Sequence, residues 1–224
     1  AAERIGRRCD LSIGAVGHIR PTLEALLPMV DTKTDSTLLL KVQKKKASYE
    51  KKMAKKGDVQ GRKAPIRPQA VARAICRHAT DSAIFIADTG EPPVWMARHI
   101  HMKGTRDFLM SFNHASMANA MPQALGAQAL DKSRQVVALC GDGGFSMLMG
   151  DFITAVTYDL PIKCVIFNNS KLGLVKMEME SMGYADWGID LKNPNFAECG
   201  IAMGGQGIRI EDPADLDAGI KRAL

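Results

Sequence analysis

The chain has 224 residues, of which 46% are hydrophobic, and carries a formal net charge of +6 at pH 7. This composition supplies a sizeable buried core and excludes an intrinsically disordered chain. No run of about 18 apolar residues and no hydrophobic signal sequence are present, so neither a membrane-spanning helix nor a secretory leader is expected. The absence of an initiating Met indicates a fragment.

The five cysteines are scattered along the chain and form no C-x-x-C pair. An odd number without a repeating spacing argues against a disulfide framework and against a zinc site. Free thiols are typical of the reducing cytosol, so a cytoplasmic location is expected.

The N-terminal third has two different compositions. Residues 1–30 are mixed, and PTLEALLPMV at their end predicts a helix that starts near Pro21 and is disturbed by Pro28. Residues 31–64 are polar and rich in lysine, mostly between 41 and 63. Such a segment could contact nucleic acid or anionic lipid, but no aromatic interleaving or DNA-binding motif accompanies it. We therefore expect a solvated, partly helical linker and no nucleic-acid partner.

From Pro65 onward, helical and strand patterns alternate. Helices are expected over 67–79, 92–101, 115–130, 146–159, 172–182 and 213–224, and strands over 83–88, 108–112, 135–140, 161–169 and 207–210. The strands are short and apolar on both faces, which predicts an α/β fold: a doubly wound parallel sheet with helices on both sides. Because such a domain often adds one more strand after a final helix, the end at Leu224 also indicates truncation.

An acidic residue between glycines follows the strand 135–140, in Gly141-Asp142-Gly143-Gly144. Ligands of parallel sheets bind at the carboxyl ends of the strands, and glycines let the backbone approach a ligand closely. A helix starting at about Ser146 would point N–H groups that favour phosphate at the same place. The carboxylate of Asp142 would repel a phosphate unless a cation lay between them, so we expect Asp142 to bind Mg²⁺.

A second ligand is expected from the next strand end. Asn168-Asn169 follows the strand 161–169, and Asn169 lies 27 positions after Asp142, which is one strand–helix–strand unit. Amide and backbone oxygens suit Mg²⁺, and the carbonyl of Lys171 could complete the set. Each half alone also fits an ordinary turn or loop. The G-x-G-x-x-G and P-loop motifs do not match these residues.

The spacing Gly141-Asp142-Gly143, 24 residues, Asn168-Asn169 is similar to the motif of thiamine diphosphate enzymes. ADTGEPPVWMARH, SFNHASMANAMPQALGAQ and GDGGFSMLMGDF resemble the pyruvate oxidase family, most closely the quinone-dependent pyruvate dehydrogenases of bacteria. The resemblance implies that 1–30 end a central FAD-binding domain, that 31–64 form the basic linker, and that 65–224 are a diphosphate-binding domain truncated at its C-terminus.

The resemblance also implies roles for individual residues. Mg²⁺ would be bound by Asp142, Asn169 and the Lys171 carbonyl. The cofactor would be contacted by Thr89, Gly90, Gly141, Gly143, Gly144, Phe145 and Val175, in addition to Asp142 and Asn169. Met117 would hold the cofactor in its bent shape, and Glu178 would act near the substrate, as the two residues with a catalytic role. A plain helix-core role for Met117 and a solvated helix acid at Glu178 remain open alternatives.

The implied activity is a thiamine diphosphate- and Mg²⁺-dependent oxidative decarboxylation of pyruvate, with electrons passing to FAD and then to quinone or oxygen. FAD is expected in the full-length protein, as is a homo-oligomer, a dimer or tetramer, in which a pyrimidine-binding domain supplies an essential glutamate. Without that domain the chain should bind the cofactor weakly. Contact with a membrane surface is considered only for the full-length protein. An acetolactate synthase-like carboligase and a non-catalytic assembly module are the alternatives.

Overall fold

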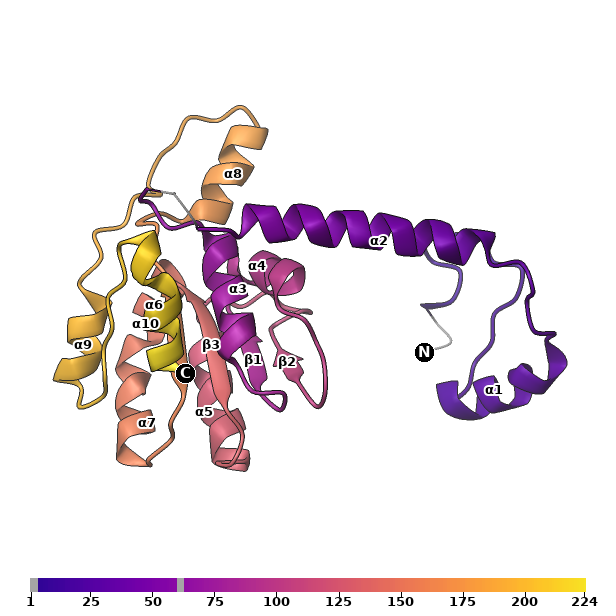
Figure 1. Cartoon of the computed structure of the whole chain (residues 1–224), viewed down its shortest axis with the longest axis horizontal. Coiled ribbons are helices and arrows are strands. Elements are labelled where there is room, and N and C mark those ends of the chain that lie inside the picture. The colour runs from indigo at the N-terminus through magenta and orange to yellow at the C-terminus, as the bar shows by residue number, and fades with distance from the viewer. Residues whose placement is uncertain (1–3, 60–62) are drawn as a thin grey trace. The chain divides into compact units, whose positions relative to one another are not determined.

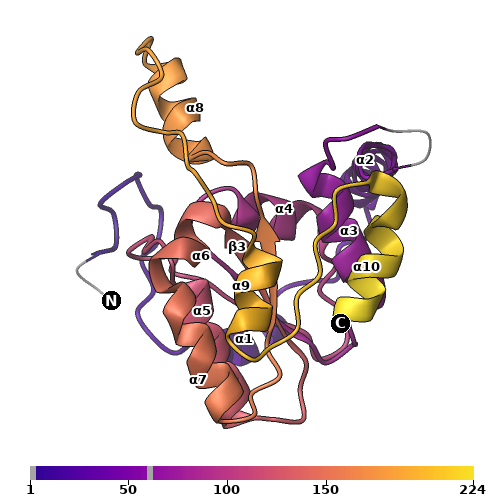
Figure 2. The same ribbon diagram turned by 90° about the vertical axis from the view of Figure 1, so that its left-hand side faces the viewer.

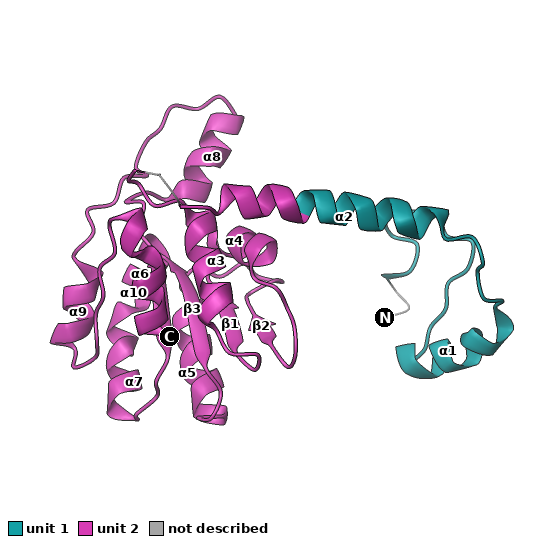
Figure 3. Cartoon of the chain, in the orientation of Figure 1, with its two compact units in different colours: residues 1–49 teal, residues 50–224 magenta. Residues whose placement is uncertain are grey.

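The structure is a computed structural model that describes residues 4–59 and 63–224, and the chain divides into two compact units, 1–49 and 50–224 (Figure 3). The first unit contains α1 (Ile19–Leu26), the 3₁₀ helix η2 (Leu27–Met29) and the beginning of α2 (Thr37–Lys56). Its described residues are all exposed. The lysine-rich segment is thus helical up to Lys56. The predicted roles of 1–30 as the end of a flavin-binding domain and of 31–64 as a linker stay predictions.

The second unit is built on a four-stranded parallel sheet (Figure 1). The strands are β1 (Ile84–Ala87), β2 (Asp107–Leu109), β3 (Val136–Gly141) and β4 (Lys163–Phe167), in the order β2-β1-β3-β4. Central β1 and β3 pair over their whole shared length, from Ile84 opposite Val136 to Ala87 opposite Leu139. The predicted parallel sheet is confirmed.

Helices cover both faces of this sheet. They are α3 (Pro68–His78), α4 (Pro92–His99), α5 (Ala120–Leu130), α6 (Asp142–Leu148), α7 (Phe152–Thr157), α9 (Phe196–Ala202) and α10 (Leu216–Ala223), with 3₁₀ turns η3 (Met149–Asp151) and η4 (Pro213–Asp215). Helix α8 (Gly173–Ser181) has no buried residue and lies beyond the ends of the strands (Figure 1). Figure 2 shows α3 and α10 on one side of β3 and α5, α6 and α7 on the other. The doubly wound α/β architecture is therefore confirmed.

Alternation along the central strands explains the two layers. Phe85 and Leu139 point into one core with α3, α4 and α10. Ile86 and Ala138 point into the other, with α5, α6 and α7. Because successive side chains of a strand face opposite ways, a strand buried on both faces must be apolar throughout. This is why the strands read as continuous apolar runs in the sequence.

The strand predicted over 207–210 is wrong, because these residues have no strand pairing in the structure. A cavity of about 740 Å³ is lined by 164–167 of β4 and by 206–211. Strands pair only when their backbones lie about 4.8 Å apart, so the apolar pattern of 207–210 lacks the neighbour that would make it a strand.

The helix predicted over 146–159 differs in both its start and its continuity. It begins at Asp142, so that the two glycines lie in its first turn, and the η3 turn separates α6 from α7. Glycine is a poor helix former, but tertiary packing around Gly143 and Gly144 outweighs propensity here. Helix α9 was not predicted, and no helix of the described residues is both long and apolar enough to cross a bilayer.

Candidate functional site

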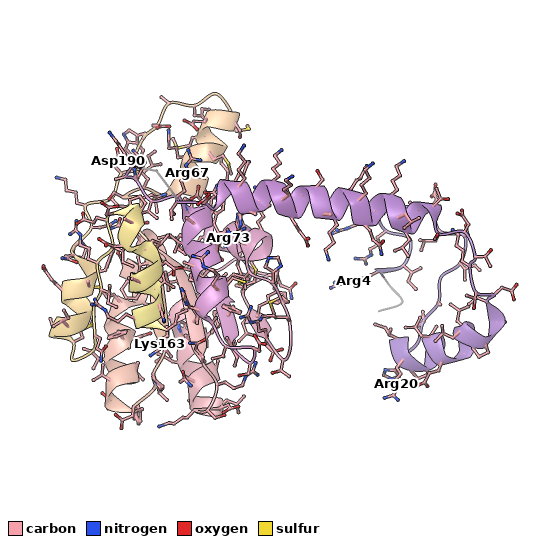
Figure 4. All side chains as sticks on the ribbon, in the orientation of Figure 1. Arg4, Arg20, Arg67, Arg73, Lys163 and Asp190 are labelled. Atoms are coloured by element: carbon pink, nitrogen blue, oxygen red, sulfur yellow. The ribbon has the colours of Figure 1, made fainter. Side chains whose placement is uncertain are left out.

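The site lies where the strand order reverses. The chain runs from β1 outward to β2 and then returns to place β3 and β4 on the other side of β1. In open parallel sheets this switch point leaves a crevice beyond the carboxyl ends of the two strands that flank it. Figure 4 marks the two ends of the unit: Lys163 starts β4, and Asp190 lies at the opposite end, where the strands finish. Residues 88–90, 141–144 and 168–171 lie at the carboxyl ends of β1, β3 and β4.

Asp142 is buried, and both of its carboxylate oxygens are hydrogen-bonded. Oδ1 accepts from the backbone N–H of Gly143 at 2.9 Å, and the side chain is part of a residue only 3% exposed. Oδ2 accepts from the backbone N–H of Ser170 at 2.6 Å and from Nδ2 of Asn193 at 2.8 Å. A carboxylate oxygen carries two lone pairs, so Oδ1 keeps acceptor capacity for a cation. The carboxylate is thus held in one orientation between the ends of β3 and β4.

The two asparagines after β4 shape a tight turn. Oδ1 of Asn168 accepts from the N–H of Ser170 at 3.2 Å, and Oδ1 of Asn169 accepts from the N–H of Lys171 at 3.0 Å. Ser170 itself has a positive φ of 56°. Asn side chains stabilise such turns by bonding the backbone two residues on. Since Ser170 donates to Asp142, the turn brings the predicted pair Asp142 and Asn169 to neighbouring strand ends, as expected.

The carbonyl of Lys171 is left available by a short antiparallel bridge. Lys171 pairs with Asp190, and the two flanking hydrogen bonds, of 2.8 and 2.9 Å, use backbone groups of the neighbouring residues. In such a pair the N–H and C=O of the central residue point away from the opposite strand. The Lys171 carbonyl accepts no backbone bond from the described residues, while its ammonium pairs with the Asp190 carboxylate.

The chemistry of these donors fits Mg²⁺. One carboxylate, one amide oxygen and one backbone carbonyl are hard oxygen ligands, and Mg²⁺ takes few protein ligands because it keeps waters and binds phosphates. Within the described residues no group of three or more His, Cys, Asp or Glu could hold a metal. A magnesium site in this chain would therefore depend on amide and backbone oxygens, as the set Asp142, Asn169 and Lys171 does.

A second buried carboxylate, Asp88, follows β1 and faces the same glycines. Its Oδ1 accepts from the N–H of Thr89 at 2.9 Å and from Nδ2 of Asn119 at 3.2 Å. Burial raises the pKa of Asp88, and the backbone N–H groups of Thr89 and of residues 118–120 only partly offset this effect. A Cβ on Gly144 would lie 1.8 Å from Asp88 Oδ2, so glycine is required there by close approach.

The other predicted cofactor residues lie at or next to these strand ends. Thr89 is half-buried, and Gly90 has a φ of 127°, which favours glycine. A Cβ on Gly141 would meet open space, whereas Phe145 is buried and packs edge-on against Phe196. The ring of Phe145 therefore belongs to the core, and only its backbone could serve a ligand.

Met117 lies beside Gly143. Its Cε would be 2.9 Å from a Cβ placed on Gly143, and the residue is 39% exposed. The alternative that Met117 is plain helix core does not hold, because it precedes α5 and is not buried. An exposed, flexible thioether next to the strand ends is suited to contact an apolar ring of a ligand.

Val175 and Glu178 are not part of the cluster of residues at the strand ends. Both are exposed on α8, and in the described part of the chain the Glu178 side chain forms no hydrogen bond with the other predicted residues. Figure 1 shows α8 at the end of the unit where the strands finish, so the helix borders the site. The alternative of a solvated helix acid at Glu178 thus remains open.

Sequence reasoning missed Asn193 and Asp88. Asn193 stands in a polar connection 51 residues after Asp142, where Asn-Pro-Asn indicates only a turn. Asp88 stands in ADTG directly after a buried strand, which is the same signal that indicates Asp142.

Comparison with known proteins agrees with this geometry. Residues 88–224 match the family described as "Thiamine pyrophosphate enzyme, C-terminal TPP binding domain". Over 221 residues the chain is 34% identical to YdaP of Bacillus subtilis, which is named "Putative thiamine pyrophosphate-containing protein YdaP". The matched region covers 99% of this chain and 38% of that protein. It is 27% identical to a pyruvate oxidase of Lactiplantibacillus plantarum over 92% of this chain and 34% of that protein.

An acetolactate synthase large subunit of Lactococcus lactis is similar to the same extent. It is 26% identical over 98% of this chain and 38% of that protein. The chain therefore spans little more than a third of the length of these relatives, and their names do not separate an oxidase from a synthase. The family match over 88–224 and the switch-point site lead to one conclusion: the chain belongs to the thiamine pyrophosphate enzyme family and contains its C-terminal cofactor-binding domain.

Proposed function

We propose that this chain is the cofactor-binding part of an enzyme that decarboxylates pyruvate oxidatively with thiamine diphosphate and Mg²⁺, and passes the electrons to FAD and then to quinone or oxygen. In the proposal Asp142, Asn169 and the Lys171 carbonyl bind Mg²⁺. The working protein is a homo-oligomer in which a pyrimidine-binding domain completes the site.

The observation that carries the proposal is the fixed carboxylate of Asp142 beside the Asn169 turn. The Ser170 N–H, 2.6 Å from Asp142 Oδ2, ties the turn to the carboxylate before any ion is present. An ion bound there would lie next to the glycines of the switch point, where a diphosphate can approach the backbone. Asp142, Asn169 and the Lys171 carbonyl would hold Mg²⁺ here, and its charge would relieve the repulsion between the Asp142 carboxylate and a diphosphate.

The chain's own residues would bind, orient and cover the cofactor. Thr89, Gly90 and the backbone of 143–145 would contact the diphosphate, while Met117 and Val175 would pack against the faces of its rings. Glu178 would face the substrate from α8. The bound cofactor supplies an electron sink for the carbanion that decarboxylation leaves.

The test of cofactor binding uses amide NMR spectra of the chain, which detect weak binding. Mg²⁺ added together with thiamine diphosphate should shift the signals of Gly143, Gly144 and Ser170, and each component alone should shift them less. The substitution Asp142→Asn should abolish the joint effect. Asp190→Asn removes the same charge from an exposed neighbour and is the matched control, which should retain it. Equal shifts in the parent and in Asp142→Asn would rule out the proposed metal site.

A second candidate, a carboligase of the acetolactate synthase type, is favoured by the 26% identity to the Lactococcus lactis subunit. Product analysis on the full-length protein with pyruvate separates the two reactions. Acetate with reduction of a dye supports the oxidase, and acetolactate without dye reduction supports the carboligase. Cofactor binding with neither product would favour a non-catalytic assembly module.

A further inference from the structure

Asn193 joins the two strand ends that form the proposed metal site. Its Nδ2 donates to Oδ2 of Asp142 at 2.8 Å and to Oδ1 of Asn168 at 2.9 Å. A side-chain amide nitrogen carries two hydrogens, so both bonds can be made at once. The residue comes from the connection between α8 and α9 and is separated from these partners by 51 and 25 positions.

The bond to Asp142 restricts the rotation of its carboxylate. Oδ2 accepts from Asn193 and from the Ser170 N–H, whereas Oδ1 accepts from the Gly143 N–H and keeps a lone pair for a cation. Hydrogen bonds to an ionised group are roughly twice as strong as neutral ones. Asn193 therefore selects one orientation of the acid.

The bond from Asn193 to Asn168 stabilises the turn that carries the other two proposed metal ligands, Asn169 and Lys171. Oδ1 of Asn168 also accepts from the N–H and the hydroxyl of Ser170, at 3.2 and 3.3 Å. Asn193 thus holds the side chain that shapes the turn preceding Lys171. The side-chain amide of Asn193 thus fixes the Asp142 carboxylate and the turn at 168–171 relative to each other.

We propose that Asn193 is a positioning residue for divalent-ion binding at Asp142, and that it sets the preference of the site for Mg²⁺ over Ca²⁺. The inference depends on the proposed function, since it concerns the same ion. Mg²⁺ demands near-ideal octahedral geometry, whereas Ca²⁺ tolerates irregular ligands. Loss of the residue that orients the ligands should harm Mg²⁺ binding more. Substitution of outer-shell partners typically lowers metal affinity by about 10- to 100-fold.

The matched control is Asn195, two positions along the same connection. Its Oδ1 accepts from the N–H of Ala197 at 3.2 Å and caps α9, and it makes no bond to the strand ends in the described residues. Asn195→Ala should lower the stability of the fold modestly through loss of this cap, seen as a lower urea midpoint, without changing ion affinity.

The experiment measures Mg²⁺ and Ca²⁺ dissociation constants of the full 224-residue chain at a fixed excess of thiamine diphosphate, from the amide signal of Gly143. Asn193→Ala should weaken Mg²⁺ at least tenfold and Ca²⁺ about threefold or less. Should Ala reduce the folded fraction, Asn193→Ser replaces it, because a serine hydroxyl is too short to reach both acceptors.

Three outcomes are distinguishable. If the parent shows no joint binding of Mg²⁺ and thiamine diphosphate, the proposed function fails, and the role of Asn193 fails with it. If the parent binds but Asn193→Ala matches Asn195→Ala in affinity, only the role of Asn193 fails. Equal losses for Mg²⁺ and Ca²⁺ would overturn the claim on ion preference.

Discussion

Gly144 offers the sharpest test of how the site is packed, through the substitution Gly144→Ala. In the first turn of α6 an alanine would gain up to about 1 kcal/mol from helix propensity. Its Cβ, however, would lie 1.8 Å from Asp88 Oδ2 and 2.9 Å from Asp88 Cγ, where ordinary contact begins at 3.4 Å. Asp88 would have to move by about 1.6 Å, the difference between 3.4 and 1.8 Å.

That movement is costly because Asp88 is buried and held. Its Oδ1 is bonded to Thr89 and Asn119, and its residue is 1% exposed. Overpacking of this kind costs about 1–3 kcal/mol, which exceeds the propensity gain. We expect Gly144→Ala to lower the free energy of unfolding by about 1–2 kcal/mol and to weaken cofactor binding.

Urea denaturation compares this variant with two others. Gly126→Ala, in α5 where a Cβ meets nothing within 4 Å, should raise the free energy of unfolding by up to about 1 kcal/mol. Gly143→Ala should cost less than Gly144→Ala, because the nearest atom, Met117 Cε at 2.9 Å, ends a flexible side chain. In an Asp88→Ala background the cost of Gly144→Ala should fall by more than about 0.5 kcal/mol. If the Gly144→Ala variant were as stable in urea as the Gly126→Ala variant, this reasoning would be refuted.

Three further predictions concern single side chains. The guanidinium of Arg106 donates to the carbonyls of Ala79, Thr80 and His101 at 2.7–2.9 Å. Arg106→Met should lower the free energy of unfolding, measured in urea, by about 3 kcal/mol or more, because these buried acceptors lose their donor. Burial raises the pKa of Asp88 above its ordinary value of 3.8, so the folded state binds this proton more tightly than the unfolded state does. The stability that this group contributes is therefore lost as the pH rises from 3.8 through the pKa of the folded state. Asp88→Asn should therefore gain stability relative to the parent across that interval in denaturation at a series of pH values, and a constant difference would contradict the assignment. Lys171→Ala should keep Mg²⁺ affinity within about threefold in the NMR titration, since the proposed ligand is its backbone carbonyl and its exposed ion pair with Asp190 contributes little.

Local pattern was enough to predict the sheet and that Asp142 and Asn169 follow neighbouring strands. Each strand is a short apolar run followed at its end by polar residues, and Asp142 and Asn169 stand one strand–helix–strand unit apart. Parallel pairing then brings the strand ends to one edge whatever the helices between them do in detail. This is why the neighbourhood of Asp142 and Asn169 followed from spacing alone.

What sequence could not predict depends on contacts between distant segments. Asn193 reaches Asp142 across 51 residues, and no local pattern marks that contact. The glycines 143 and 144 read as a loop but form a helical turn, because close packing against Met117 and Asp88 decides their conformation. Residues 207–210 have the composition of a strand, yet a strand also needs a neighbour at bonding distance.

The outer edge of β4 has a practical consequence for handling the protein. The strand is last in the sheet order, its five residues are all partly exposed, and a cavity lined by both polar and apolar residues lies beside it. An uncovered strand edge is a template on which a further chain can add by backbone hydrogen bonding. Concentrated solutions of this chain should therefore self-associate through β4, and dilution would suppress that aggregation.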